Sequence, residues 1–448
     1  MDALRKAYIL GAVLLGFGYT TVTVLSLLMG VPSGPVNFAV KAGVAFLFLM
    51  SLPYALVRLD CVVKTTLPVI VFLSIYSIRL LYDVVIRDIH VMGSQSSLYV
   101  LGYFFGLTLI PVMAVSGAVR KADLGRIAQG SYVMLVASNV SLIVFAINSG
   151  LESIVQAFAG RLQADGSVDG TSVLNPIGIG LMGACLAAIS MARLVVGART
   201  GWAWVALNLV TLIIGLINIL LGASRGPAVA FAICVIAVVI SLGQSMVGRG
   251  GIGIKPRSVL YIVTPLTFMG FFVFSADNPV FLIERLSSFL EGRSQGVTEE
   301  RDFIQMRAWE DFRNSPVVGS SYLVSLDNSF AHNIGYEALI STGLLGTILL
   351  CWIVWRILRA LFRGWRGVAG PDGYGLTLIV ICFATIQLTS GTIGQTPEFW
   401  VYSSLLMIFT ESTSRRFGDE SSRSGICTEI IRRDGAKPTV NRDRCLVP

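Results

Sequence analysis

Residues 202–221 read WAWVALNLVTLIIGLINILL, twenty consecutive positions without a charged side chain. A helix of that length rises about 30 Å, which matches the hydrocarbon core of a bilayer. Similar apolar runs recur along most of the 448-residue chain, which is 54% hydrophobic and 13% charged. Soluble domains carry roughly 25% charged residues, so an ordinary soluble enzyme, a disordered chain and a disulfide-stapled secreted scaffold are excluded. The sequence predicts an all-α, polytopic membrane protein.

About twelve apolar windows are long enough to be considered as transmembrane helices. They cover residues 7–29, 36–57, 66–82, 98–118, 127–148, 175–196, 202–221, 227–247, 258–275, 333–355, 374–393 and 398–411. Alternate loops carry most of the Lys and Arg residues, from Arg5 and Lys6 to the tail that begins at Arg415 and Arg416. Because basic loops stay in the cytoplasm, both termini are predicted to be cytoplasmic.

Three longer stretches interrupt the pattern of spans and short loops. Residues 149–174 are predicted to form a polar outside loop, and residues 276–332 a large periplasmic loop within a membrane domain of residues 1–411. Residues 412–448 are polar and are expected to be a disordered cytoplasmic tail. In the large loop, apolar residues recur at helical spacing, so we expect an amphipathic helix packed on the membrane domain. These residues are Phe303, Met306, Trp309 and Phe312.

Charge and cysteine content restrict the partners and cofactors. The net charge is +8, but basic residues beside membrane spans are better explained by topology and anionic lipid than by nucleic acid. The seven cysteines contain no Cys-x-x-Cys pair and there are only two histidines, so neither a disulfide framework nor a zinc site is expected. The acids of the outer loop leave a carboxylate-bound Mg²⁺ as an alternative. The first run, Ala7 to Met29, is too long for a signal peptide.

Arg225 stands in the stretch Gly222-Ala-Ser-Arg-Gly-Pro227, at the predicted outer junction of two spans. Pro227 suits the first turn of the following helix, and Gly226 is expected to let the backbone turn tightly. That helix N-terminus and Arg225 together would present positive charge to an anion. The alternative interpretation is an arginine that reaches the membrane interface from a tight hairpin.

Arg301, Arg307 and His332 are further candidates in the large loop. An Arg fork outside the cytoplasm suits a pair of diphosphate oxygens better than Lys does. Neighbouring acids, among them Glu300 and Glu310, make surface ion pairs the alternative role for either arginine. His332 precedes Asn333 at the start of a span and could act as a base or as a cation, or be structural. The other histidine, His90, receives no role.

The chain resembles the O-antigen ligase/polymerase family of bacterial envelope glycosyltransferases. The resemblance rests mainly on Ala331-His-Asn-Ile-Gly-Tyr-Glu-Ala-Leu-Ile-Ser-Thr-Gly-Leu-Leu-Gly346, which looks like that family's His-Asn motif followed by Gly-x-x-Gly. Asn314-Ser-Pro-Val-Val-Gly319 matches the Pro-x-x-Gly element of the family. Arg301 and the Ser224-Arg-Gly226 element stand where the family has outer-face arginines. The family's usual Trp after the loop arginine is replaced by Gln305, which leaves the choice between Arg301 and Arg307 open.

The resemblance implies transfer of a glycan from undecaprenyl diphosphate to a sugar hydroxyl at the periplasmic face of the bacterial inner membrane. Negative charge would grow on the leaving diphosphate, so Arg225 and Arg301 are the expected cationic clamp. His332 would accept the proton of the acceptor or hold the diphosphate. The expected substrate-binding residues are Arg307, Asn333, Glu337 and Ser224, and no metal or other cofactor is expected.

The acceptor and the reaction class leave alternatives. A polymerase would use a second lipid-linked repeat, and a ligase would use the lipid A core of lipopolysaccharide; the polymerase, in O-antigen or exopolysaccharide assembly, is favoured. Other polysaccharide-assembly proteins and membrane lipids are expected partners. The alternative class is a transporter or flippase for the same lipids, which usually carries ionisable residues at mid-membrane.

Overall fold

The computed structural model describes residues 2–57, 59–90, 97–148, 164–165, 172–174, 176–196, 201–222, 224–246, 263, 267, 297–325, 328–364 and 370–411. In these ranges the chain is almost entirely helical, and eight helices are long and apolar enough to cross a bilayer. They are Leu4–Leu28, Gly34–Leu56, Lys64–Ile86, Leu98–Ala118, Asp123–Asn148, Pro176–Val195, Trp202–Gly222 and Ile334–Arg363. Each overlaps a predicted span, so the helical, multi-pass architecture is confirmed at this level.

Four of the twelve predicted spans are not among these eight. The windows 227–247 and 374–393 correspond to shorter apolar helices, Arg225–Ser241 and Gly373–Thr389. The window 398–411 lies in a buried helix of residues 397–411. The window 258–275 (apart from residues 263 and 267), the first part of the large loop (residues 276–296) and the tail of residues 412–448 lie outside the described residues.

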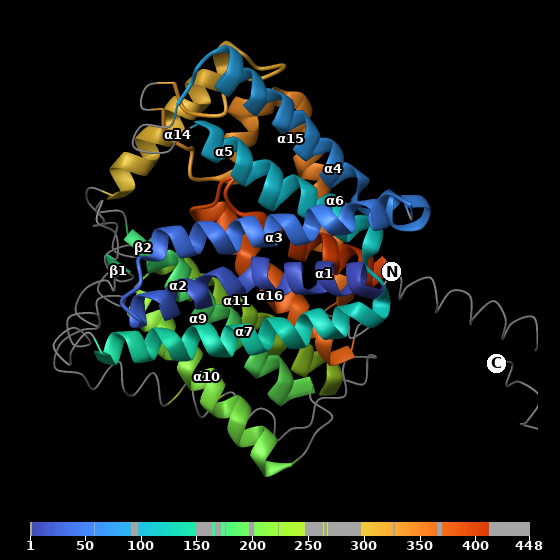
Figure 1. Cartoon of the computed structure of the whole chain (residues 1–448), viewed down its shortest axis with the longest axis vertical. Helices are drawn as coiled ribbons and strands as arrows, with labels where there is room; N and C mark the ends of the chain where they lie inside the picture. Colours follow the sequence, from blue (N-terminus) through green and yellow to red (C-terminus); the bar gives the residue numbers. More distant parts are fainter. Residues whose placement is uncertain are drawn as a thin grey trace, which may run out of the picture.

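The elements follow one another as a chain of helices with one small β-ribbon (Figure 1). The first half comprises α1 (Asp2–Val13), η1 (Leu14–Gly18), α2 (Tyr19–Leu28), α3 (Ser33–Leu56), α4 (Leu59–Leu81), η2 (Tyr82–Ile86), α5 (Ser97–Tyr103), η3 (Phe104–Leu109), α6 (Ile110–Ala118) and α7 (Lys121–Asn148). The second half comprises β1 (Ala164–Asp165), β2 (Ser172–Leu174), α9 (Pro176–Val196), α10 (Trp202–Gly222), α11 (Arg225–Met246), α14 (Val297–Asn314), α15 (Ile334–Arg363) and α16 (Gly370–Thr389). η1 and η3 are wider π-helical turns within otherwise continuous helices, and η2 is a turn of the same kind that ends the helix begun by α4.

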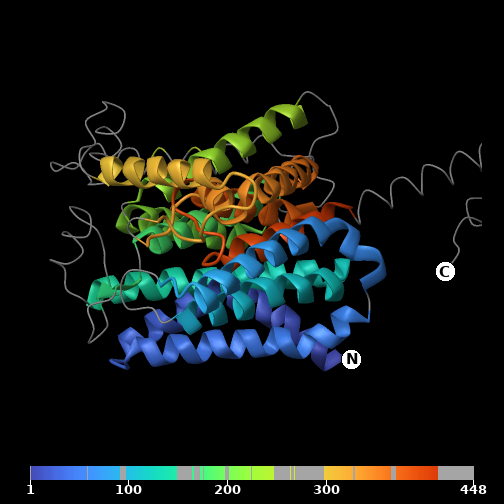
Figure 2. The ribbon, with the colours of Figure 1, turned by 90° about the horizontal axis from the view of Figure 1, so that it is seen from above.

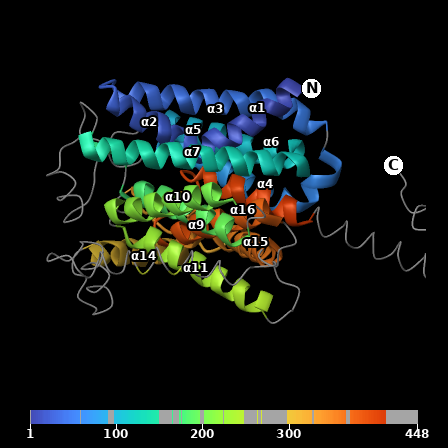
Figure 3. The same cartoon turned by 90° about the horizontal axis from the view of Figure 1, so that it is seen from below.

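Small and amide side chains hold the centre of the bundle together. A Cβ on Gly183 of α9 would lie 2.5 Å from the carbonyl oxygen of Gly215 of α10, so these two helices touch through their backbones. Asn218 Nδ2 donates to Asn139 Oδ1 at 2.7 Å, which joins α10 to α7. Close small-residue contacts and interhelical amide bonds are how helices associate in lipid. Figures 1 and 3 show α1, α3 and α7 side by side, with α9 and α16 behind them.

The amphipathic helix expected in the large loop exists as α14, but three of the four residues expected on its packing face do not lie there. Phe303, Met306 and Trp309 are exposed, whereas Ile304 and Ala308 are buried. Phe312, the fourth, is half-buried and packs against the cluster that contains Ile304 and Ala308. Successive three-residue steps on an α-helix drift by about 60° each, so residues at that spacing wind around the helix instead of forming one face. Figure 2 shows α14 in yellow at one edge of the molecule, and its buried side packs against α15.

Candidate functional site

The His-Asn pair lies at the start of α15, where the two residues have different backbone roles. Asn333 is the N-cap: its Oδ1 accepts hydrogen bonds from the backbone N–H groups of Gly335 (2.8 Å) and Tyr336 (3.4 Å). Such caps satisfy donors that the first helical turn leaves unpaired. His332 is half-buried and adopts a left-handed backbone with φ of 51°. Left-handed backbone is uncommon outside glycine and clusters at functional sites.

The C-terminal end of α16 is the meeting point of the predicted site residues. Asn333 Nδ2 donates to the Leu388 carbonyl oxygen at 2.7 Å. Arg301 Nη1, from α14, donates to the Thr389 carbonyl oxygen at 3.2 Å. A guanidinium has five N–H donors, so this single bond leaves Arg301 with donor capacity for an anion. Arg301 and Asn333, which lie 32 positions apart in the sequence, therefore bind adjacent carbonyl oxygens at the end of α16.

The N-terminus of α11 reaches the same place. A Cβ on Gly226 would lie 2.9 Å from Ile386 Cδ1 and 3.1 Å from Thr389 Oγ1. Gly226 is helical, so the expected tight turn is wrong: the absence of a side chain lets Ile386 and Thr389 of α16 lie close to the start of α11. Arg225 is the first residue of α11, and Ser224, immediately before it, is buried. The α11 N-terminus therefore lies beside the segment that Arg301 and Asn333 bind.

Arg307 has a different environment from Arg301. Its Nη1 donates to Glu310 Oε2 at 2.6 Å, and its guanidinium lies 5.2 Å from the centre of the Phe303 ring. These contacts lie within α14 and correspond to the surface ion pair that we considered as the alternative for either arginine. Of the two, Arg301 is the one that contacts the end of α16.

Glu337, one turn into α15, is fully buried. Its Oε1 accepts from the Tyr76 hydroxyl at 2.7 Å, and its Oε2 accepts from the backbone N–H of Ile393 at 2.9 Å. It therefore ties α4 and the segment after α16 to α15. This geometry gives Glu337 a role in holding the backbone around the end of α16.

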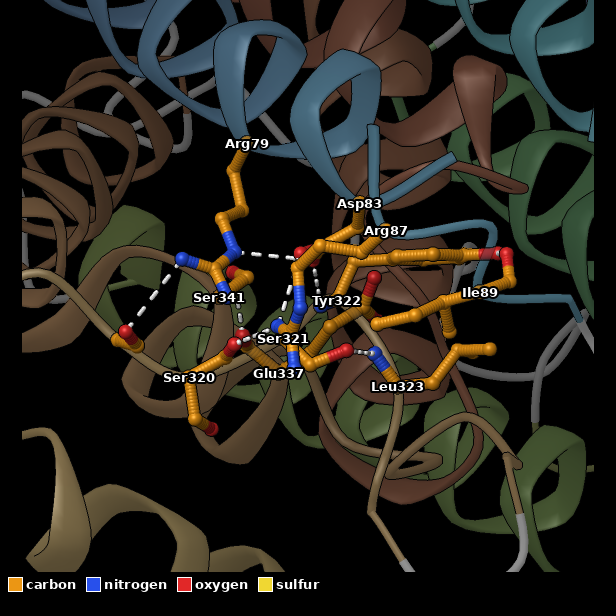
Figure 4. Close-up of polar contacts among 11 residues, drawn as sticks. Arg79, Asp83, Arg87, Ile89, Ser320, Ser321, Tyr322, Leu323, Glu337 and Ser341 are labelled. Atoms are coloured by element: carbon orange, nitrogen blue, oxygen red, sulfur yellow. Dashed lines mark hydrogen bonds and ion pairs between the residues drawn. The ribbon is translucent and has the colours of Figure 1, made fainter. Parts of the chain in front are cut away.

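A charged network that the sequence analysis missed fixes the loop before α15 (Figure 4). Asp83 of η2 is fully buried and accepts from Arg79 Nε (2.9 Å), Arg87 Nη1 (3.1 Å) and the Tyr322 backbone N–H (2.9 Å). Arg87 Nη1 also donates to the Ser320 carbonyl oxygen at 2.6 Å. The four-residue spacing of these charges at the end of an apolar span is a signal that could have identified them.

Tyr322 lies in the same loop. Burial, together with the nearby Asp83 carboxylate, raises the pKa of Tyr322 to about 12. The phenol therefore stays protonated at physiological pH and donates to the Ile89 carbonyl oxygen at 3.2 Å. The loop is thus held to the end of α4 by both its backbone and its side chains.

The Pro-x-x-Gly and Gly-x-x-Gly elements fit into each other. Gly343 breaks α15 with a φ of 63°, and Gly319 has a φ of 80°. A Cβ on Gly343 would lie 2.4 Å from the Val317 carbonyl, and one on Gly319 would lie 2.5 Å from the Ile340 carbonyl oxygen. The Ile340 oxygen accepts from the backbone N–H of Ser320 at 2.7 Å. The two motifs therefore form one joint that sets where the loop before His332 runs.

No protein-family model matches this chain, and no curated protein matches it.

The described part of the site is cationic and rich in backbone donors and acceptors. In those ranges, no three His, Cys, Asp or Glu side chains gather in the way that a metal ion would need. Arg301, His332 and Arg225 are contributed by three different elements around residues 386–389. An arginine beside a helix N-terminus is suited to bind a phosphate or diphosphate group. Arg301 and the α11 N-terminus that carries Arg225 therefore form an arrangement that suits an anion.

Proposed function

We propose that the protein is a membrane glycosyltransferase that moves a glycan from undecaprenyl diphosphate to a sugar hydroxyl at the periplasmic face of a bacterial inner membrane. The observation that carries the proposal is the convergence at the end of α16. Arg301 and Asn333 bind the carbonyl oxygens of Thr389 and Leu388, and the start of α11, with Arg225, packs against the same turn. Residues chosen from separate sequence motifs thereby share one location.

The proposed chemistry is a displacement at the anomeric carbon. The acceptor oxygen forms the new glycosidic bond while the bond from the anomeric carbon to the diphosphate oxygen breaks. The diphosphate leaves with both electrons of that bond, so Arg225 and Arg301 would stabilise charge that is largest in the transition state. His332 would remove the proton of the acceptor or hold the diphosphate as a cation. Glu337 would position the backbone, since both its oxygens already accept hydrogen bonds from the protein.

An apolar groove offers room for the isoprenoid chain. A cavity of about 300 Å³ lies between α11, α15 and α16, the helices that carry Arg225, Asn333 and Thr389 at their ends. Ile233 and Ile381 in its lining stand eight residues from Arg225 and Thr389 respectively (233 minus 225, and 389 minus 381), which is about 12 Å along a helix. From there the groove continues to Leu358 and Phe362 near the opposite end of α15. A lipid with its diphosphate at the arginines could therefore lay a long tail along this groove.

The proposed topology has twelve spans with both termini cytoplasmic and residues 276–332 in the periplasm. Cysteines introduced at residues 160–170 and 290–300 should be labelled by a membrane-impermeant reagent from outside. Those at residues 250–256 and 360–366 should be labelled only after the membrane is opened. The reason is the alternation of Lys and Arg between loops. Labelling of 290–300 only from the cytoplasm would remove the periplasmic mechanism.

The cationic mechanism predicts that transfer does not depend on a divalent metal. Transfer by purified protein should survive EDTA, and His332→Ala should lose most activity with or without Mg²⁺. If His332 is a base, activity should rise as the pH is raised and level off once the imidazole is neutral. A diphosphate-binding imidazolium predicts the opposite, a fall in activity as the pH is raised. Complete inhibition by EDTA, reversed by Mg²⁺, would contradict the arginine clamp.

A transporter of lipid-linked glycan is the second candidate, because two ionisable residues lie within the apolar bundle. Glu398 is buried and lines a small cavity together with Lys41. Ionisable residues at such positions are typical of transport pathways. Purified protein in vesicles that contain lipid-linked glycan separates the two functions. Glycan transfer without translocation supports the transferase, and translocation without transfer contradicts it.

The acceptor distinguishes a polymerase from a ligase within the proposed class. We favour the polymerase, in which a second lipid-linked repeat supplies the attacking hydroxyl. The same purified protein should then lengthen the glycan when the lipid-linked donor is the only substrate. Transfer that requires added lipid A core oligosaccharide would assign a ligase.

A further inference from the structure

A second polar pocket lies far from the candidate site, between α15, the start of α4 and the end of the helix of residues 397–411. Its volume is about 280 Å³. α4 and α15 pack against each other, as Figure 1 shows at the upper right. The pocket is about 40 Å along α15 from Asn333, so it cannot take part in the reaction proposed above. Its lining includes Trp352, Trp355, Arg356, Arg359, Arg363 and Glu411.

The charge of this pocket is unbalanced. Among the described residues, three guanidinium groups line it but only one carboxylate, Glu411. Arg363 Nη1 is 3.3 Å from Glu411 Oε2, which neutralises one of the three. Arg356 donates weakly to the Lys64 carbonyl oxygen at 3.4 Å, and Arg359 is exposed. Two positive charges therefore remain available to an anion.

The surroundings of the pocket are those of a membrane interface. Trp352 and Trp355 are 51% and 63% exposed, and both lie on the last turns of a helix that is long and apolar enough to cross a membrane. Tryptophan at that depth sits at the level of lipid headgroups. Leu345 and Ile348, which lie one to two turns before Trp352 on the same face of α15, are also exposed and apolar. A ligand here would meet guanidinium groups and lipid-exposed apolar side chains together.

We infer that this pocket binds the phosphate group of an anionic phospholipid, with Arg356 and Arg359 on the phosphate and the acyl chains along the exposed apolar side chains of α15. Guanidinium groups match the geometry of phosphate oxygens, and basic pockets between transmembrane helices recognise anionic headgroups. A soluble phosphate compound would use the arginines but would gain nothing from the exposed tryptophans and leucine.

Native mass spectrometry of the full chain in detergent tests this inference. Phosphatidylglycerol and phosphatidylcholine with the same acyl chains are added at equal concentrations, and the lipid retained per protein is counted. The wild-type protein should retain phosphatidylglycerol about ten-fold more than phosphatidylcholine. Arg356→Gln/Arg359→Gln should reduce that retention to the phosphatidylcholine level. Arg126→Gln, which removes an exposed arginine from the start of α7, is the matched control and should change nothing.

Two further measurements separate loss of lipid binding from misfolding and from binding of free phosphate. Arg359→Gln alone changes an exposed residue, so it should fold normally and lower retention of phosphatidylglycerol by itself. Inorganic phosphate at millimolar concentration should leave bound phosphatidylglycerol in place. Equal retention by the double variant, or displacement by inorganic phosphate, would overturn the inference, and displacement would assign the pocket to a soluble phosphate compound instead.

Discussion

Replacement of Arg225 by alanine is expected to abolish glycan transfer, with a loss of at least about 100-fold in turnover, because one preorganised donor to developing charge typically contributes that much. Arg301→Ala should have a similar effect. Arg225→Lys should recover only part of the activity, since an ammonium lacks the planar fork that binds two oxygens at once. The measurement is transfer from lipid-linked donor by purified protein, at matched protein levels.

Arg307→Ala is the matched control for this experiment. Arg307 lies on the same helix as Arg301, but it pairs with Glu310 and stacks on Phe303 instead of contacting α16. The Arg307→Ala variant should keep most of the transfer activity. Full activity of Arg225→Ala at a normal protein level, or equal losses in Arg301→Ala and Arg307→Ala, would contradict the proposed clamp.

Replacement of Asp83 by alanine is expected to cause the largest loss of stability, about 3 kcal/mol, because breaking a buried ion pair leaves its partners uncompensated. Asp83 is fully buried, and Arg79, Arg87 and the Tyr322 backbone all donate to it. The loop that leads to His332 should loosen, so thermal unfolding in detergent should begin at lower temperature. Proteolysis within residues 315–325 should become faster.

Asp88→Asn serves as the control for Asp83. Asp88 is five residues further along the chain, and its carboxylate is 83% exposed beside His90. Exposed pairs of this kind contribute little, and asparagine tolerates the φ of 55° that Asp88 adopts. The unfolding temperature of the Asp88→Asn variant should match that of the unmodified protein. Equal stability of Asp83→Ala would show that the buried network does not hold the loop.

Hydropathy alone predicted the eight long apolar helices among the described residues. The span predicted at 202–221 is the helix Trp202–Gly222, and the span at 98–118 has the same limits in the structure. Long apolar runs admit no other structure in a bilayer, because every backbone polar group must be paired within the segment. The helical segment in the large loop was also predicted, since its charged and apolar residues alternate at helical spacing.

Contacts between elements were beyond the reach of the sequence. The packed face of α14 was predicted wrongly because the large apolar residues at three-residue spacing were followed instead of the four-residue spacing of Ile304 and Ala308, which are the buried pair. Gly226 was interpreted as a turn residue, although its function is to let Thr389 approach. Arg301 and Asn333 bind carbonyl oxygens whose position depends on where α16 ends in space. No local sequence pattern encodes that position.

The interlocking of Gly319 and Gly343 bears on how this protein could be recombined with others. Each glycine lies against the main chain of the segment that contains the other glycine. Because these contacts involve backbone atoms, side-chain changes cannot adapt either segment to one from another protein. A chimaera that imports the loop while keeping the host helix would join two surfaces that were never fitted to each other. Residues 316–344 would therefore have to be transplanted together, as one cassette.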